Sequence, residues 1–202
     1  KMPIFSIPTD FARFNELTDY YRFVNISLSF SYFKKLNIQQ RQEIYSLLKS
    51  KNIIHVEIIA FCLIQNHYHF LVKQITERGI IDWMSNIQNG YAKYYNKRHD
   101  RIGPLFQPRF KAVRIETDDQ LLHVSRYIHL NPSTSYIVSA NNLQNYKWSS
   151  LPIYLQDEYS QTFINPTIVL DIINGTKNYK EFVFNQASYQ RELARIRHLI
   201  LE

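Results

Sequence analysis

The sequence predicts an α+β fold in which helices cover one face of an antiparallel sheet. Two amphipathic helical segments precede a pair of apolar segments joined by a tight turn, and a long amphipathic helix and a further strand–helix pair come after them. The chain has 202 residues, of which 45% are hydrophobic and 15% aromatic. It can therefore bury a sizeable core, and disorder throughout the chain is excluded.

Two helices are predicted before the first strand of the sheet. Thr9 or Asp10 can cap the first helix. Its apolar positions are Phe11, Phe14, Leu17 and Tyr20 or Tyr21. Residues 25–30 fit either a short strand or a loop, and residues 39–51 predict the second helix. The side chains expected on its inner side are Ile44, Leu47 and Leu48.

A β-hairpin and a long helix are predicted in the middle of the chain. Residues 55–64 are rich in β-branched side chains and predict a buried strand. Gln65–Asn66 fits a tight turn, so residues 67–75 are expected to return as the second strand. Residues 80–99 predict a long amphipathic helix, and Gly103–Pro104 breaks the helical pattern after it.

A strand and then a helix are predicted next. Residues 110–116 predict the strand, and Asp118 or Asp119 can cap the helix. We expect this helix to end near Asn131 because the next residue is Pro132.

Shorter helices are predicted in the last quarter of the chain. Their expected ranges are 167–173, 179–184 and 189–201. We therefore divide the chain into a main domain, residues 1–155, and a helical C-terminal extension, residues 156–202.

Composition excludes several kinds of protein. A single cysteine, Cys62, rules out a disulfide framework and a multi-cysteine zinc site. Four glycines are too few for a glycine-rich phosphate loop. The longest apolar run, residues 58–64, is too short to span a bilayer, and no signal segment opens the sequence. We therefore expect a soluble, intracellular protein.

Positive charge is concentrated in residues 91–114, although the whole chain carries a net charge of only +7. The basic residues there are Lys93, Lys97, Arg98, Arg101, Arg109, Lys111 and Arg114, against the single acidic residue Asp100. The interleaved aromatic residues are Tyr91, Tyr94, Tyr95, Phe106 and Phe110. Cations that meet phosphates and rings that stack on bases suit single-stranded or hairpin nucleic acid. A solvated helix face next to a basic loop explains the same pattern equally well.

His67 and His69 lie two positions apart on a predicted strand. Successive strand residues alternate faces, so the two imidazoles share one face while Tyr68 and Phe70 share the other. Such a pair can chelate a divalent metal. The motif alone fits two partly exposed sheet histidines as well.

Tyr127 and Asn131 lie four positions apart on a predicted helix and therefore on one helical face. An activated phenol can attack a phosphodiester, and an amide oxygen can serve as a metal ligand. Because the chain has 15 tyrosines, the same pattern is also well explained by a tyrosine of the core and an asparagine at the end of a helix.

Four segments occur in a characteristic order. They are Phe61–Val72, which contains His-Tyr-His; Gly103–Ala112, which contains Gln-Pro-Arg-Phe-Lys; Arg126–Pro132, Arg-Tyr-Ile-His-Leu-Asn-Pro; and Tyr146–Ser150, Tyr-Lys-Trp-Ser-Ser. Together they resemble the single-tyrosine transposases of the HUH nuclease superfamily, and most closely the branch of REP-associated tyrosine transposases. The resemblance covers most of residues 1–155.

The resemblance implies a ferredoxin-like fold and a role for each matching residue. His67 and His69 match the metal-binding histidines, Tyr127 the nucleophile, and Asn131 the polar residue that completes the metal site. It implies Mg²⁺ or Mn²⁺ as the cofactor and single-stranded or hairpin DNA as the partner. Further cations expected on the DNA backbone are Arg109 and Lys111.

The chain departs from the family pattern at several places. Gln65 stands where the family has proline, and Pro108 stands where it has glycine. Residues 1–5 correspond to a point just after the family's first strand. If that strand is absent, an open sheet edge or a swapped partner is expected. Residues 25–37 form an insertion with no assigned family role.

The leading hypothesis is a metal-dependent DNA strand transferase that works through a 5′-phosphotyrosine. His123 or His129 could assist Tyr127, although surface histidines are the simpler expectation for both. The alternatives are a DNA-hairpin-binding protein that no longer cuts, a related HUH relaxase or replication initiator, and, more distantly, a zinc hydrolase. The sequence leaves open whether the protein is a monomer or a homodimer.

Overall fold

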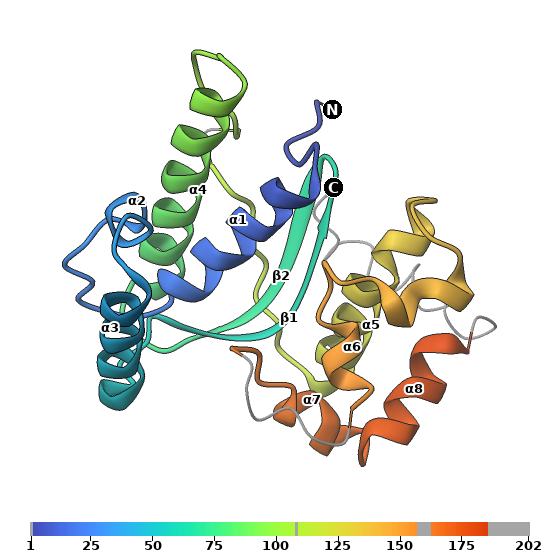
Figure 1. Ribbon diagram of the computed structural model, residues 1–202. Helices are drawn as coiled ribbons and strands as arrows, with labels where there is room; N and C mark the ends of the chain where they lie inside the picture. Colours follow the sequence, from blue (N-terminus) through green and yellow to red (C-terminus); the bar gives the residue numbers. More distant parts are fainter. Residues whose placement is uncertain (1, 108, 157–162, 186–202) are drawn as a thin grey trace. The chain divides into compact units, whose positions relative to one another are not determined.

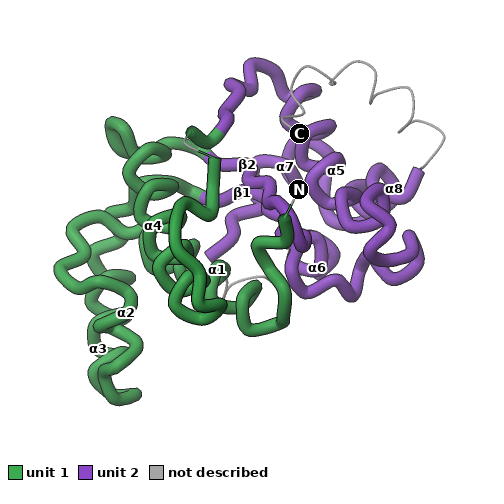
Figure 2. The backbone as a smooth tube through the Cα atoms, turned by 90° about the horizontal axis from the view of Figure 1, so that it is seen from above, with its two compact units in different colours: residues 1–57, 73–110 green, residues 58–72, 111–202 purple. Residues whose placement is uncertain are grey.

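The computed structural model describes residues 2–107, 109–156 and 163–185. The chain divides into two compact units (Figure 2). The first unit comprises residues 1–57 and 73–110, and the second comprises residues 58–72 and 111–202.

The described residues form a mixture of helices with one antiparallel two-stranded sheet, which confirms the α+β class (Figure 1). The elements in chain order are α1 (Pro8–Tyr20), α2 (Phe30–Phe33), α3 (Ile38–Lys51), β1 (Val56–Ile64), β2 (His67–Gln74), α4 (Gly79–Arg98), α5 (Asp118–Thr134), the 3₁₀ helix η1 (Ala140–Asn145), α6 (Leu151–Tyr154), α7 (Thr167–Ile172) and α8 (Thr176–Phe184). In the part of the chain that the structure describes, no helix is long and apolar enough to cross a membrane.

Aromatic side chains hold α1 against α4 in the first unit. Phe14 lies edge-on to Tyr91, with ring centroids 5.1 Å apart, and both side chains are completely buried. The Trp83 indole on α4 donates a hydrogen bond of 3.1 Å to the carbonyl of Thr18 on α1. Apolar burial and a satisfied indole N–H together explain why these two predicted helices pack here.

The α3 helix forms over the predicted residues but buries none of its side chains. Asn37 caps its first turn by accepting a hydrogen bond from the backbone N–H of Gln40. Leu47, which we expected to face inward, is 56% exposed. That expectation was wrong because the helical period identifies an apolar face without identifying what covers it.

The second unit is built on the β-hairpin formed by β1 and β2. On the edge of β1 away from β2, Cys62 forms an antiparallel bridge with Ser149, and Ile58 forms a parallel bridge with Ile164. The Leu63 N–H donates to the Trp148 carbonyl at 2.8 Å. The segments around Ser149 and Ile164 therefore form hydrogen bonds with backbone groups of β1 that would be unpaired in a two-stranded sheet alone.

The strand predicted over residues 110–116 is absent. The segment has no regular secondary structure and forms no ladder, and the side chains from Lys111 to Arg114 are all exposed. Alternating polar and apolar residues predict a strand only where one face finds a partner, and this segment has no buried face.

The limits of two predicted helices differ from their expected positions. The α1 helix begins at Pro8, and Asp10 in its first turn accepts from the backbone N–H of Ser6 at 2.9 Å. The α5 helix is capped by Thr117, one residue before the expected aspartates, and it continues through Pro132 to Thr134. Proline so near a helix end costs one backbone hydrogen bond, which the last turn tolerates.

Helices α7 and α8 confirm two of the three helices predicted near the C-terminus. The third, residues 189–201, lies outside the described residues. Both helices belong to the same compact unit as α5, which carries Tyr127.

Candidate active site

The two predicted histidines lie together on one face of β2. The ring centroids of His67 and His69 are 4.8 Å apart, with the ring planes at 87° to each other. The Nε2 atoms of both rings are buried. On the other face, Tyr68 and Phe70 contact each other with centroids 5.5 Å apart, as strand alternation predicts.

Asn66, in the turn before β2, orients the first of these rings. Nδ1 of His67 lies 2.7 Å from Oδ1 of Asn66. Because a carbonyl oxygen can only accept, Nδ1 carries the proton, and in the neutral form of the ring Nε2 has a lone pair. A histidine oriented in this way presents Nε2 as a ligand.

Tyr127 and Asn131 on α5 complete the cluster. The Tyr127 ring lies 5.4 Å from the His69 ring between centroids, at 77°. The amide nitrogen of Asn131 donates to the Tyr127 hydroxyl at 3.4 Å. Tyr127 is 6% exposed and Asn131 is 2% exposed. The structure thus brings together, within one compact unit, the four residues that the sequence singled out.

The donor set fits a divalent metal. Oδ1 of Asn131 is buried and has no hydrogen-bond partner among the described residues, and a buried polar atom in that state calls for a ligand. Two imidazole nitrogens and an amide oxygen are suitable donors for such an ion. No group of three or more His, Cys, Asp or Glu side chains that could hold a metal occurs in the described part of the chain. A metal bound here would therefore draw its remaining ligands from water or a substrate phosphate.

His129 lies two positions after Tyr127 on α5, but it is completely buried rather than on the surface. Its Nδ1 lies 2.7 Å from the hydroxyl of Tyr179 on α8, and its Nε2 lies 2.7 Å from Oγ of Ser150. Burial lowers the pKa of the imidazole to about 3, so the ring is neutral. The expectation of a surface histidine was wrong, and a ring engaged at both nitrogens is a poor candidate to accept the proton of Tyr127.

A continuous chain of hydrogen bonds passes through His129. The backbone N–H of Phe61 donates to Ser150 Oγ at 2.8 Å, and the Tyr179 hydroxyl donates to Ser125 Oγ at 3.0 Å. Ser125 in turn donates to the Leu122 carbonyl at 2.8 Å. If Ser150 donates to His129 Nε2 and Nδ1–H donates to Tyr179, every hydroxyl donates once and accepts once. We call Ser125, His129, Ser150 and Tyr179 the buried network.

Sequence reasoning did not assign the buried network a role. Two signals were present, because His129 and Ser150 both occur in segments that carry the resemblance. Nothing in the sequence distinguishes a histidine that supports a helix from one that performs chemistry. Tyr179 lies 50 residues from His129, so only the fold shows their contact.

His123, one turn before Tyr127, is half-buried. Its Nε2 lies 3.4 Å from Asp119 on the preceding turn, and its ring lies 5.3 Å from the Phe182 ring.

The seven basic residues predicted to bind DNA are divided between the two units. Only Lys111 and Arg114 belong to the unit that contains the histidine–tyrosine cluster, and both are exposed. The residues in the first unit are Lys93, Lys97, Arg98, Arg101 and Arg109. In that unit, Arg101 donates to the Asn96 side chain and to the Pro104 carbonyl, at 3.1 and 3.2 Å.

Two of the aromatic rings expected to stack on bases belong to the core. Tyr91 is completely buried and Tyr95 is 6% exposed. Their hydroxyls donate to the carbonyls of Ile4 and Pro3, at 2.5 and 3.1 Å. The proposed stacking role was wrong for these two residues because the amphipathic helix turns them inward.

A comparison with protein families identifies the family to which the chain belongs. The family described as transposase, IS200-like, matches residues 21–131, more than half of the chain. Neither the curated proteins nor the solved structures give a significant match. The family match confirms the resemblance to HUH-superfamily transposases, while the REP-associated branch stays a prediction. The match includes β1, β2 and the part of α5 that carries Tyr127 and Asn131, so this chain belongs to the family of IS200-like transposases.

Proposed function

We propose that this transposase cleaves and rejoins single-stranded or hairpin DNA with Tyr127 as the nucleophile. The observation that carries the proposal is the contact of Tyr127 with His69 on one side and Asn131 on the other. All four residues that the proposal requires lie in one compact unit of the chain.

His67, His69 and Asn131 would hold the metal, which we propose to be Mg²⁺ or Mn²⁺. IS200-like transposases generally depend on a divalent metal. When bound, the ion would polarise the scissile phosphate and offset the charge that develops on it. The buried Oδ1 of Asn131 and the oriented Nε2 of His67 support this assignment.

Tyr127 would form the covalent bond to DNA. Its phenolic oxygen attacks the phosphorus atom, and the bond from phosphorus to the 3′ oxygen breaks. The products are a 5′-phosphotyrosine and a free 3′-hydroxyl. When a 3′-hydroxyl attacks the phosphotyrosine, the strand is rejoined and the phenol is restored, so no ATP is consumed.

The proton balance of this reaction involves two oxygens. Tyrosine has an ordinary pKa of about 10, so the phenol must lose its proton as it attacks, and the departing 3′ oxygen must gain one. The Asn131 amide donates a hydrogen bond of 3.4 Å to the Tyr127 oxygen. Because Tyr127 and Asn131 lie one turn apart on α5, this contact fixes the position of the phenolic oxygen relative to the helix.

The proposal is tested by trapping the covalent adduct. The substrate is a set of single strands with hairpins, labelled at the 3′ end, because the tyrosine remains on the fragment whose 5′ phosphate it attacked. The strands are incubated with Mn²⁺ or with EDTA and then run on a denaturing gel. We expect a labelled adduct that requires metal, is abolished in Tyr127→Phe, and falls by at least about a hundredfold in His67→Ala.

Tyr136→Phe is the matched control. Tyr136 lies just past the end of α5 and is 97% exposed, so it is a readily accessible tyrosine close to Tyr127 in sequence. If the adduct is lost in Tyr136→Phe and kept in Tyr127→Phe, the nucleophile is Tyr136 and the proposal is wrong. Binding of hairpins without an adduct in any metal would replace the proposal by a hairpin-binding protein that no longer cuts.

A further inference from the structure

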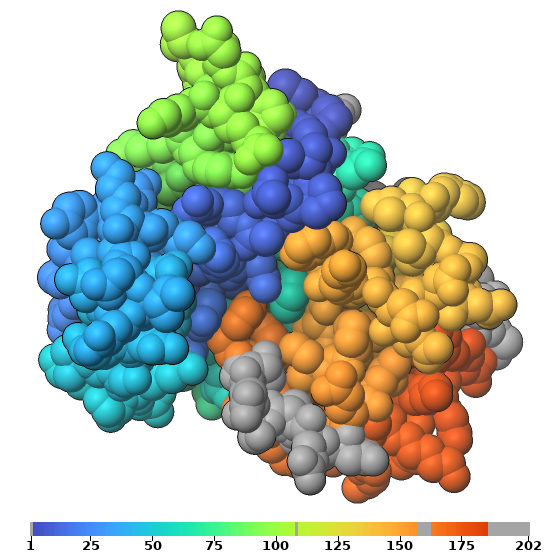
Figure 3. Space-filling model, viewed as in Figure 1, coloured from blue at the N-terminus to red at the C-terminus, as the bar shows by residue number. Residues whose placement is uncertain are grey.

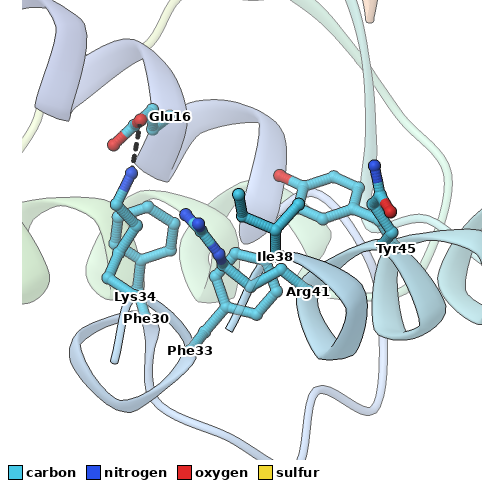
Figure 4. A pocket seen from close by; sticks show the side chains of 8 residues that line it. Glu16, Phe30, Phe33, Lys34, Ile38, Arg41 and Tyr45 are labelled. Carbon is cyan, nitrogen blue, oxygen red and sulfur yellow. Dashed lines mark hydrogen bonds and ion pairs between the residues drawn. The ribbon is translucent and has the colours of Figure 1, made fainter. Parts of the chain in front are cut away.

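A pocket of about 400 Å³ lies between α1, α2 and α3 in the first unit (Figure 4). Its volume is at the lower end of the usual range for small-molecule sites, roughly 300–1,000 Å³. It is lined by Glu16, Phe30, Phe33, Lys34, Ile38, Arg41, Gln42 and Tyr45. The segment from α2 to α3 lies at the molecular surface (Figure 3), so a ligand in solution can reach it.

Aromatic rings provide the flat walls of this pocket. The Phe33 ring lies 5.4 Å from the Tyr45 ring between centroids, at 60°, and 4.8 Å from the Tyr20 ring. The Tyr45 hydroxyl donates to Asp19 at 3.3 Å, which fixes the ring. Because Phe33 is 4% exposed and packed on both sides, the walls are already rigid before a ligand binds.

Some of the polar side chains that line the pocket have a partner within the protein, and one has an N–H without a partner among the described residues. At one end Lys34 and Glu16 form an ion pair of 2.7 Å, so their charges offset each other. Nε of Arg41 is buried and has no hydrogen-bond partner among the described residues. In Figure 4, Arg41 lies between that ion pair and Tyr45. A buried guanidinium N–H of this kind calls for an acceptor.

Charge at the pocket favours an anionic ligand. Of the two basic side chains that line it, Lys34 is paired with Glu16, whereas Arg41 forms no ion pair among the described residues. Lys35, next to Lys34, adds an exposed positive charge. A flat ring with acceptor atoms on its edge, attached to a phosphate, therefore matches the walls, the buried N–H and the surrounding charge together.

We infer that this pocket binds an unpaired nucleobase of single-stranded DNA, with Arg41 as donor to the base edge and the neighbouring lysines beside its phosphate. The inference rests on the proposed function in that the ligand is the DNA strand on which the enzyme acts. It adds a second DNA contact, in the compact unit that does not contain Tyr127.

Photocrosslinking of the full chain tests the site directly. A single strand carrying 5-iododeoxyuridine is bound and irradiated, and the attached residues are mapped by mass spectrometry. We expect crosslinks at Tyr45, the least buried of the aromatic side chains that line the pocket. Arg41→Gln should reduce their yield about tenfold, since a charge-assisted hydrogen bond is lost. Arg41→Lys should restore only part of it, because ammonium keeps the charge but not the planar donors.

Lys51→Gln is the matched control, because Lys51 is an exposed residue of α3 that does not line the pocket. It removes the same charge and should lower the yield by less than about twofold. Equal losses in Arg41→Gln and Lys51→Gln would overturn the inference, as would crosslinks that all lie outside the pocket. So would a dimer that Ile38→Glu dissociates, in the absence of pocket crosslinks, because a second copy would then be the occupant.

The Tyr127 adduct, measured in the same samples, separates this inference from the proposed function. An adduct without pocket crosslinks would overturn the pocket alone. Pocket crosslinks that respond to Arg41→Gln, without any adduct, would overturn the strand-transfer proposal and support the base site.

Discussion

Helices α5 and α3 contrast in what they bury, although both are amphipathic in the sequence. Of the 17 residues of α5, nine are buried, and the polar ones among them are Ser125, Arg126, His129 and Asn131. None of the 14 residues of α3 is buried. The helix that carries the proposed nucleophile is enclosed on several sides, whereas the helix that lines the aromatic pocket is open to solvent.

The difference shows how each helix can serve its proposed role. A buried polar group must be paired, so each hydrogen bond of the buried network constrains how α5 is rotated and placed along its axis. Ser150, beside β1, and Tyr179, on α8, hold α5 through the single side chain of His129. On α3 no side chain is fully buried, so the residues on its outer face are open to solvent.

Among single substitutions, we expect His129→Ala to lower the free energy of unfolding the most. The substitution removes a completely buried ring and leaves the Tyr179 and Ser150 hydroxyls without their shared partner. A cavity together with unpaired buried groups should lower the free energy of unfolding by about 3–5 kcal/mol. Urea unfolding monitored by circular dichroism measures this loss. A loss below about 1 kcal/mol would show that the network does not hold α5.

The protonation of His129 gives a second, pH-dependent prediction. Burial lowers its pKa to about 3 in the folded protein, from 6.5 as the ordinary value. The unfolded chain therefore binds a proton as the pH falls below about 6.5, while the folded chain remains neutral at this ring. Its contribution to stability is complete above pH 6.5 and is lost as the pH falls towards 3, with a slope approaching about 1.4 kcal/mol per pH unit.

Comparison of unfolding free energies between pH 7 and 5 isolates this effect. The difference between the wild type and His129→Gln should shrink as the pH falls, because only the wild type has the buried imidazole. Parallel curves for the wild type and His129→Gln would mean that His129 is not buried in its neutral form in solution.

The contrast between the helices also shows what local sequence can predict. The β-hairpin and the positions of α3, α4 and α5 follow from periodicity and turn residues, which are local properties. The strand expected over residues 110–116 failed because a strand depends on a partner, and Lys111 to Arg114 are exposed instead. The prediction that Leu47 faces inward was wrong for the same reason, because the burial of a side chain depends on the rest of the fold.

Prediction of the candidate site divides in a similar way. Strand alternation places His67 beside His69, and helical spacing places Tyr127 beside Asn131, so each pair follows from local geometry. That the two pairs meet was implied only by the resemblance, and the ring contact of His69 with Tyr127 now places them together. The supporting role of His129 required the position of Tyr179, which no local pattern provides.

We expect Leu47→Gln, on α3, to change the free energy of unfolding the least. Because the side chain is 56% exposed, the substitution should change the free energy of unfolding by less than about 0.5 kcal/mol. Urea unfolding at two protein concentrations measures the change and shows whether it depends on association. A loss of about 2 kcal/mol that grows with concentration would show that a second copy covers α3 in solution. The contrast with α5 would then be a property of the isolated chain, and the partner of α3 would be protein rather than DNA.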